Sequence, residues 1–199
     1  MAKNILVIDF SYIMYPVIRL YADRVNIEEN STVLWRQFSE LYGLDTNILK
    51  YDATAYKNII KLVTKLACKN NSIESAMDMK LLCDEMKLSD ETYNITNIDY
   101  FDDMDFVDEI SDKYNDLNWV NYLYNKDKVE SYTWISTSTS RVKSYPESTS
   151  ISKIDKISET KWDKVLLVFS PLFVPYEYKN LFDIQEIIVN TIKDSKKES

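Results

Sequence analysis

The stretch Asn4-Ile5-Leu6-Val7-Ile8-Asp9-Phe10 is a continuous apolar run that is interrupted only by a carboxylate near its end. A run of this kind is typical of a strand that is buried on both faces of a parallel sheet. Because ligands in such sheets bind at the carboxyl ends of the strands, we expect Asp9 to lie at the edge where a site would form. The stretch therefore predicts both the central strand and the position of a candidate site.

Two further segments have a similar character. Residues 93–100 are predicted to be a second central strand that runs into acidic residues, and residues 164–169 a third that runs into Ser170-Pro171. Since helical patterns separate the strands, the fold class is α/β, a three-layer sandwich with a mainly parallel central sheet flanked by helices. Helices are predicted after Pro16 to about residue 25 and over 31–42, 54–69, 72–87 (with Met77, Leu81 and Leu82 inward), 118–124 and 176–192; a further strand is predicted over 131–136.

The length of 199 residues is that of a single domain, 1–199. Within it, residues 136–152 are rich in Ser and Thr without an apolar period, which favours a polar loop or insertion. Residues 193–199 are charged and are predicted to be a frayed tail. No internal repeat divides the chain.

The composition excludes several classes of chemistry. The chain has no histidine and one glycine, Gly43. Without histidine there is no Ser-His-Asp or Cys-His pair and no His-ligated zinc, and one glycine cannot form a GxGxxG or GxxxxGK[ST] loop. The net charge of −8 disfavours nucleic acid as a partner, since a phosphate-binding surface needs clustered Lys and Arg. We expect a protein partner, with a homo-oligomer as a further possibility.

The remaining bulk features indicate a location and a source. No apolar segment is long enough for a membrane span, and the N-terminal run is too short for a signal peptide. Cys68 and Cys83 lack CxxC spacing and are predicted to be buried on helix faces, which is typical of a reducing compartment. We therefore expect a cytoplasmic protein with no membrane partner. The richness in Lys, Asn, Ile and Tyr is typical of an AT-rich bacterial or phage genome; a phage protein would act in the host cytoplasm.

The densest chemical feature is the acidic segment that begins at Asp99. It holds six acidic residues within eleven positions. Like charges at this density favour either a bound cation or displaced pKa values. Hard divalent ions take oxygen ligands, so Asp99 and Asp103 are the main candidates for one Mn²⁺ or Mg²⁺ ion, with Asp9 and Asp105 secondary. A solvated acidic turn at a helix N-terminus is the alternative.

Three segments together resemble the arginase/deacetylase superfamily, in a branch of small arginase-like proteins. Asn97-Ile98-Asp99-Tyr100-Phe101-Asp102-Asp103-Met104 resembles the D-x-H-x-D motif at a strand end. Leu117-Asn118-Trp119-Val120 is similar to an N-W-V segment, and residues 168–178 are similar to an S-P-x-x-x-P turn between a strand and a helix.

The resemblance implies that Asp99 and Asp103 occupy metal-ligand positions, whereas Phe101 stands where the family has a ligating histidine. Phenylalanine offers no lone pair, so the resemblance implies a metal site that is lost or remodelled. It also implies Asn118, Trp119, Ser170 and Glu177 as pocket residues. In the helix predicted over 72–87, residues 74–78 would lie where relatives offer a further histidine.

Other polar and aromatic candidates have structural explanations. Ser170 has no histidine to activate it, so we expect it to cap the following helix with Pro171 at the first helical position. Trp119 and Trp134 are predicted to anchor the core or its rim, and Tyr12 to pack in the core.

Three functions follow from these features. The first is a catalytically degenerate arginase-like domain that acts by binding, as an accessory, regulatory or structural protein. The second is a Mn- or Mg-dependent hydrolase with an all-carboxylate site, in which a carboxylate serves as the base. The third is an interaction module that uses a tyrosine-rich surface, since the chain has fifteen tyrosines. The sequence does not identify catalytic residues, and the expected cofactor is either none or one Mn or Mg ion.

Overall fold

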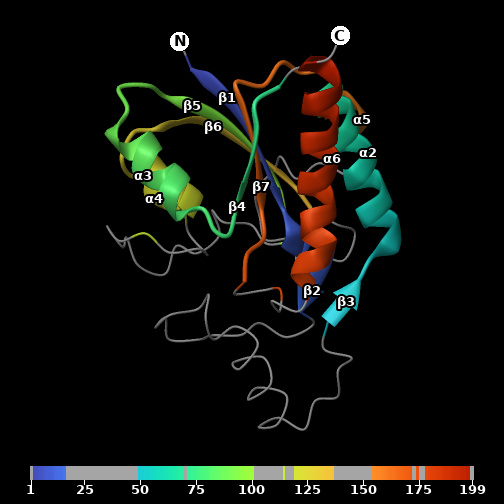
Figure 1. The fold of residues 1–199 in the computed structure, drawn as a ribbon. Helices are drawn as coiled ribbons and strands as arrows, with labels where there is room; N and C mark the ends of the chain where they lie inside the picture. The colour runs from blue at the N-terminus through green and yellow to red at the C-terminus, as the bar shows by residue number, and fades with distance from the viewer. Residues whose placement is uncertain are drawn as a thin grey trace, which may run out of the picture.

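Parallel strands form the central sheet of the protein (Figure 1). In the computed structural model, which describes residues 2–16, 49–69, 71–100, 114, 119–136, 154–171, 174 and 178–197, this sheet has five strands in the order β4-β7-β1-β5-β6. All four pairings between neighbouring strands are parallel. The strands are β1 (Lys3–Asp9), β4 (Ile73–Ala76), β5 (Tyr93–Ile98), β6 (Val129–Ile135) and β7 (Lys164–Val168).

Strand β1 lies in the middle of the sheet and pairs with β7 on one side and β5 on the other. Its residues 5–8 are all buried, because helices cover both faces of the sheet. The predictions for residues 4–10, 93–100 and 164–169 are confirmed as β1, β5 and β7. The α/β class with a parallel sheet flanked by helices is confirmed with them.

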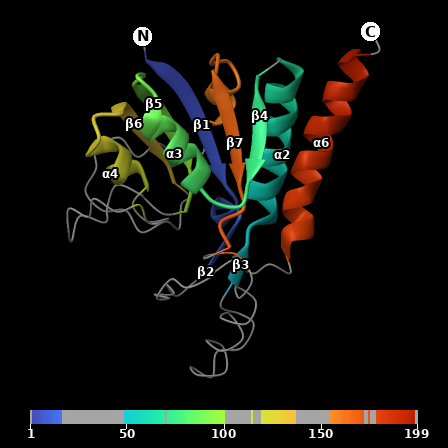
Figure 2. The ribbon, with the colours of Figure 1, turned by 60° about the vertical axis from the view of Figure 1, so that its left-hand side comes forward.

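Helices cover the two faces of the sheet, as Figure 2 shows. Helices α2 (Ala53–Cys68) and α6 (Lys179–Lys197) pack on one face, over a core that includes Leu6 and Ile8. Helices α3 (Lys80–Leu88) and α4 (Trp119–Tyr124) pack on the other, over Ile5 and Val7. Alternate residues of β1 therefore belong to two separate cores, as expected for a strand with two buried faces.

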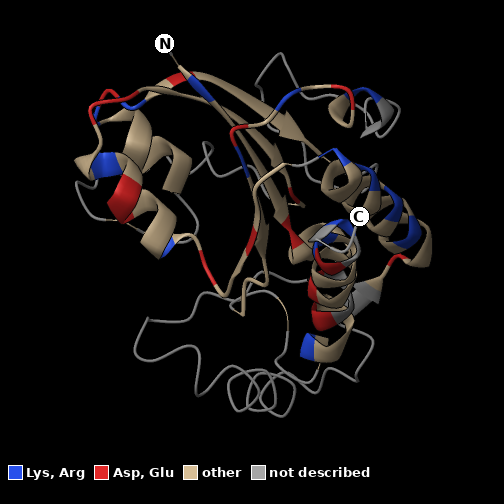
Figure 3. Ribbon diagram, turned by 45° about the horizontal axis from the view of Figure 1, so that its top comes forward, with Lys and Arg blue, Asp and Glu red and all other residues tan. Residues whose placement is uncertain are grey.

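Helix α2 shows why its sequence is helical. The Asp52 carboxylate caps it by accepting hydrogen bonds from the amides of Thr54 and Ala55, each 2.9 Å long. Its buried residues recur at intervals of three and four, which forms one apolar face. The opposite, exposed face carries basic residues, which Figure 3 draws in blue: Lys57, Lys61 and Lys65.

A small antiparallel ribbon follows the carboxyl end of β1. The 3-10 turn η1 (Phe10–Tyr12) leads into β2 (Met14–Pro16), which pairs with β3 (Leu49–Tyr51). The helices predicted over 17–25 and 31–42, and Gly43, lie outside the described residues. So does the polar segment predicted over 136–152, apart from Ser136. The short helix α5 (Ile154–Ile157) precedes β7.

The helix predicted over 72–87 is wrong in its first half. Residues 73–76 form β4, which pairs with β7, and helix α3 begins only at Lys80. The apolar spacing of Met77 and Leu81 suits a helix, but pairing with a strand 92 positions further along overrides that local pattern. Leu81 is 73% exposed, whereas Leu82 is buried. Residues 74–78, where the resemblance implies a further histidine in relatives, therefore comprise the last three residues of β4 and the start of a bend.

Helix α6 begins later and ends later than predicted. It spans Lys179–Lys197, so the part of the expected frayed tail up to residue 197 is helical. Lysine side chains of the last turns bond back to the core: Lys193 Nζ to the Ile73 carbonyl (3.1 Å) and Lys196 Nζ to the carbonyls of Ala67 and Cys68 (2.8 Å each). These hydrogen bonds hold the last turns of α6 against the core, which the charged composition of this segment did not indicate.

Several burial predictions can be compared with the structure. Tyr12, Trp119, Trp134 and Cys83 are buried, as expected. The prediction for Cys68 is wrong, because this residue is the last of α2 and is exposed. Among the described residues, no helix combines the length and apolar composition that crossing a membrane requires.

Candidate functional site

The carboxyl end of β1 places a buried carboxylate at the edge of the sheet. Asp9 is 6% exposed, and its Oδ1 accepts a hydrogen bond from the Ser11 amide at 2.8 Å. This bond makes Asp9 the cap of the turn η1, since a short carboxylate side chain can satisfy an amide two residues ahead. The local sequence therefore fixes how Asp9 is oriented.

Strand β5 brings a second carboxylate to the same edge. In the parallel register Ile8 of β1 pairs with Ile98 of β5. The next residues along the two strands, Asp9 and Asp99, therefore stand at corresponding positions of neighbouring strands. Asp99 is 4% exposed, and its Oδ1 accepts a hydrogen bond from the hydroxyl of Ser11, which is itself fully buried. Ser11 thus contacts both carboxylates, one through its amide and one through its hydroxyl.

Strand β7 contributes a serine to the same network. The Ser170 hydroxyl donates a hydrogen bond to Oδ2 of Asp9. Ser170 has a φ of 55°, in the left-handed region that a residue with a Cβ rarely occupies. Its amide donates to the Met77 carbonyl (2.9 Å), which ties the ends of β4 and β7 together. Backbone strain of this type recurs at functional sites.

Strand β6 closes the network on the other side. The indole Nε1 of Trp134 donates to the Asp99 carbonyl (3.0 Å), and the Asp99 amide donates to the Ile135 carbonyl (3.2 Å). Asn97 and Ser136 are further buried polar residues at the carboxyl ends of β5 and β6. Polar groups from four strand ends therefore meet in one continuous cluster.

The two carboxylates determine what this edge could bind. Both are buried, and each accepts a hydrogen bond from a hydroxyl group, with a further one from an amide at Asp9. Oxygen donors suit a hard divalent cation. Within the part of the chain that the structure describes, however, no group of three or more His, Cys, Asp or Glu side chains lies close enough together to hold a metal ion. The described part of this edge therefore presents two buried carboxylates, those of Asp9 and Asp99.

The structure brings together some of the predicted residues and not others. Asp9, Asp99 and Ser170 lie in the network described above. Trp119 lies in the core beneath α3 and α4. The remaining candidates lie outside the described residues: Phe101, Asp103, Asp105, Asn118 and Glu177.

The prediction that Ser170 caps the following helix depends on residues 172–173 and 175–177, which lie outside the described residues; helix α6 begins at Lys179. The Ser170 hydroxyl bonds to Asp9, because the end of β7 lies beside the end of β1. Neither Ser11 nor the indole bond of Trp134 was predicted from the sequence. The spacing Asp9-x-Ser11 at a strand end, which is typical of a capped turn, is a signal that could have indicated Ser11.

Comparison with protein-family models, with curated proteins and with solved structures finds no match to this chain.

Proposed function

We propose that the protein is a non-catalytic, arginase-like domain that acts by binding, and that its carboxyl-edge network organises the surface that binds. The observation that carries the proposal is the hydrogen bonding of Asp9. Oδ1 accepts from the Ser11 amide and Oδ2 accepts from the Ser170 hydroxyl. Both oxygens of a carboxylate at the expected ligand position are thus used to hold two loops.

The residue types support the same proposal. The chain has no histidine, and Phe101 stands where the resemblance implies a ligating imidazole. An imidazole is the usual base or metal ligand in hydrolytic sites that work near neutral pH. A site without one would need carboxylates for every catalytic role. A network that fixes the ends of four strands is better suited to presenting a rigid surface to a partner.

A metal-dependent hydrolase is the second candidate, and the sheet register favours it. Asp9 and Asp99 follow the matched pair Ile8 and Ile98, and Asp103 and Asp105 come soon after in the sequence. Each carboxylate oxygen has two lone pairs, so a serine donor does not prevent it from ligating a cation. A Mn²⁺ or Mg²⁺ ion held by Asp9, Asp99 and Asp103 would supply a Lewis acid for hydrolysis.

Titration calorimetry with Mn²⁺, Mg²⁺ and Zn²⁺ separates the two candidates. The binding-domain proposal predicts no saturable uptake in the micromolar range and a melting temperature that a chelator does not change. Asp99→Asn and Asp103→Asn are the test variants, and Asp90→Asn is the control, since Asp90 is exposed and lies near the amino end of β5. Micromolar binding that both test variants abolish and the control retains would overturn the proposal and favour the hydrolase candidate.

A further inference from the structure

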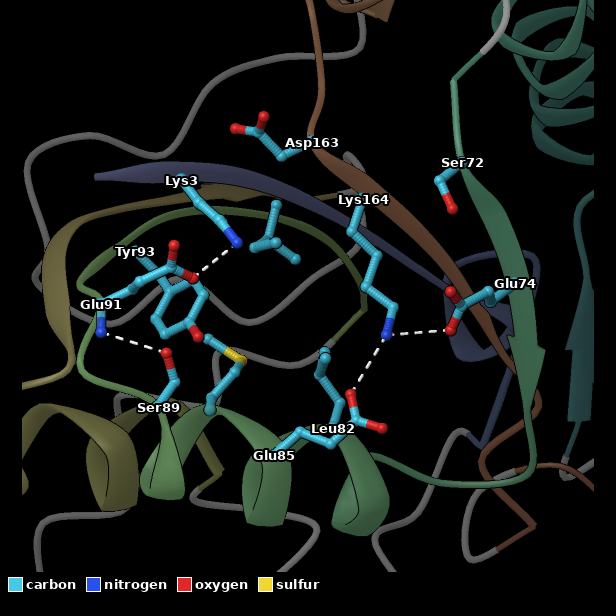
Figure 4. A pocket seen from close by; sticks show the side chains of 12 residues that line it. Lys3, Ser72, Glu74, Leu82, Glu85, Ser89, Glu91, Tyr93, Asp163 and Lys164 are labelled. Carbon is cyan, nitrogen blue, oxygen red and sulfur yellow. Dashed lines mark hydrogen bonds and ion pairs between the residues drawn. The ribbon is translucent and has the colours of Figure 1, made fainter. Parts of the chain in front are cut away.

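A groove of about 450 Å³ lies at the opposite, amino end of the sheet (Figure 4). It is bounded by helix α3 and by the first residues of β1, β4, β5 and β7. Its volume falls within the range of small-molecule sites in proteins. The groove is separate from the carboxyl-edge network, so a ligand bound in it would be independent of the proposed function.

The sheet register explains why charged groups line this groove. Lys3 and Ile5 are on the same face of β1, and Ile5 pairs with Lys164 of β7. Both lysines therefore project from the sheet face that α3 covers. Lys3 and Lys164 are separated by two residues along a strand and by one inter-strand spacing. Their Cα atoms are therefore about 8 Å apart. Figure 4 shows both side chains directed into the groove.

Both lysines form ion pairs with glutamates that also line the groove. Lys164 Nζ is 2.9 Å from Glu74 and 3.2 Å from Glu85, which come from β4 and α3. Burial by itself lowers the pKa of Lys164, but the two glutamates outweigh it and raise the pKa. Lys3 Nζ is 2.6 Å from Glu91, and the hydrogen bond to Glu91, followed by weaker attractions that include Asp163, raises its pKa. Among the residues that line the groove, four carboxylates (Glu74, Glu85, Glu91 and Asp163) outnumber the two lysines.

Apolar side chains complete the groove. Ile5, Leu82, Met86 and Tyr93 line it and are otherwise buried in the core beneath α3. In Figure 4, Lys3 and Glu91 lie on one side, and Lys164, Glu74 and Glu85 on the other. The groove thus combines carboxylates on two sides with an apolar lining, which suits a cation that carries an aliphatic chain.

We propose that this groove binds a linear aliphatic diamine or polyamine, with one ammonium group at each lysine-centred cluster and the methylene chain against the apolar lining. Carboxylates lie on both sides of the groove, so a ligand with an ammonium group at each end can contact both sets. Solvent-exposed ion pairs contribute little to stability, so the glutamates can turn from the lysines to a ligand at little cost. Of the three glutamates, Glu85 is the most accessible, with a side chain that is 67% exposed, and Glu74 and Glu91 follow with 52% and 40%.

Calorimetry with 1,5-diaminopentane, with spermidine and with pentylamine tests the proposal at one fixed ionic strength. The diamine is expected to bind at least about tenfold more tightly than the monoamine, since it makes a second charge contact worth about 1.4 kcal/mol. Glu85→Gln and Glu91→Gln are each expected to weaken diamine binding by about the same factor. Glu130→Gln is the matched control, because Glu130 is an exposed glutamate of β6.

The control separates a built site from general attraction to an acidic protein. The proposal is overturned if the diamine does not bind, if pentylamine binds as tightly, or if Glu130→Gln weakens binding as much as the groove variants do. Thermal melting of each variant checks that it folds. As a second readout, labelling the methionine methyl groups should show a ligand-dependent NMR shift for Met86, which lines the groove. A shift confined to other methionines would also contradict the proposal.

Discussion

The hydroxyl of Ser11 donates a hydrogen bond to the carboxylate of Asp99, 88 residues further along the chain. Both groups are buried, so the bond joins the ends of β1 and β5 where water has little access. Through its amide, Ser11 also holds Asp9. One small side chain thus couples the two carboxylates of the candidate site, and the integrity of the carboxyl edge depends on it.

Removing this hydroxyl should destabilise the protein. Ser11→Ala leaves a buried carboxylate without one of its donors, which typically costs about 1–3 kcal/mol. Urea denaturation followed by circular dichroism measures the loss. Ser131→Ala is the control, because Ser131 makes its 2.7 Å bond to Asn94 in an exposed position and should cost much less. Equal losses in the two variants would contradict the role given to Ser11.

Substitutions at Ser170 should separate its hydrogen bond from its backbone strain. Both Ser170→Ala and Ser170→Gly lose the bond to Asp9, but only glycine relieves the φ of 55°. We expect the glycine variant to be about 1 kcal/mol more stable than the alanine variant. Asp127 has the same φ, so the stability difference between Asp127→Gly and Asp127→Ala measures the effect of backbone strain alone. Ser170 variants of equal stability would show that its conformation is not strained.

The alkaline stability of the protein should depend on Tyr12. Burial, with a smaller effect of the Asp52 carboxylate, raises the pKa of Tyr12 from 10.0 to about 12. The unfolded chain therefore releases this proton at a lower pH than the folded chain does. The stability that the neutral phenol contributes is present below pH 10 and is lost as the pH rises towards about 12.

Tyr12→Phe should remove this contribution to the pH dependence. At neutral pH we expect no destabilisation, since the Tyr12 hydroxyl makes no hydrogen bond in the described part of the structure. Denaturation at several alkaline pH values measures the difference, with Tyr124→Phe as the control at a residue that is 55% exposed. A steeper alkaline loss in Tyr12→Phe than in the wild type would contradict the prediction.

Two adjacent leucines of α3 test which face of this helix is buried. Leu82 is 6% exposed and lies in the core beneath α3, whereas Leu81 is 73% exposed. We expect Leu82→Ala to cost about 2–5 kcal/mol, as buried leucines do, and Leu81→Ala to change stability by less than about 0.5 kcal/mol. Thermal melts of the two variants give the comparison. A large loss of stability in Leu81→Ala would instead support the sequence-based prediction that Leu81 faces the core.

Long apolar strands and their ends were predictable from the sequence. Strands β1, β5 and β7 are continuous or alternating apolar segments, and the rule that ligands bind at carboxyl ends placed Asp9 and Asp99 correctly at one edge. Strand β4 was not predictable, because its four residues show no alternation of apolar and polar side chains and its formation depends on pairing with β7.

The hydrogen bonds of the site could not be predicted from the sequence for a related reason. Ser170 bonds to Asp9 across 161 positions, and Ser11 bonds to Asp99 across 88. Contacts of this kind come from the strand order, which local patterns do not determine. The same holds for Lys164, whose two glutamate partners come from separate elements. Local chemistry identified single residues, and only the assembled sheet shows which of them meet.

The position of β7 has a consequence for how the protein is made. It is the last of the described strands in the sequence, yet it lies between β4 and β1. During synthesis, β1, β5 and β6 can associate while β4 still lacks the neighbour with which it pairs. One side of β1 stays open over the same period, and open strand edges promote association between chains. A chain whose synthesis stalls, or that is cleaved, before residue 164 would therefore expose an unpaired edge of β1 that is prone to aggregate.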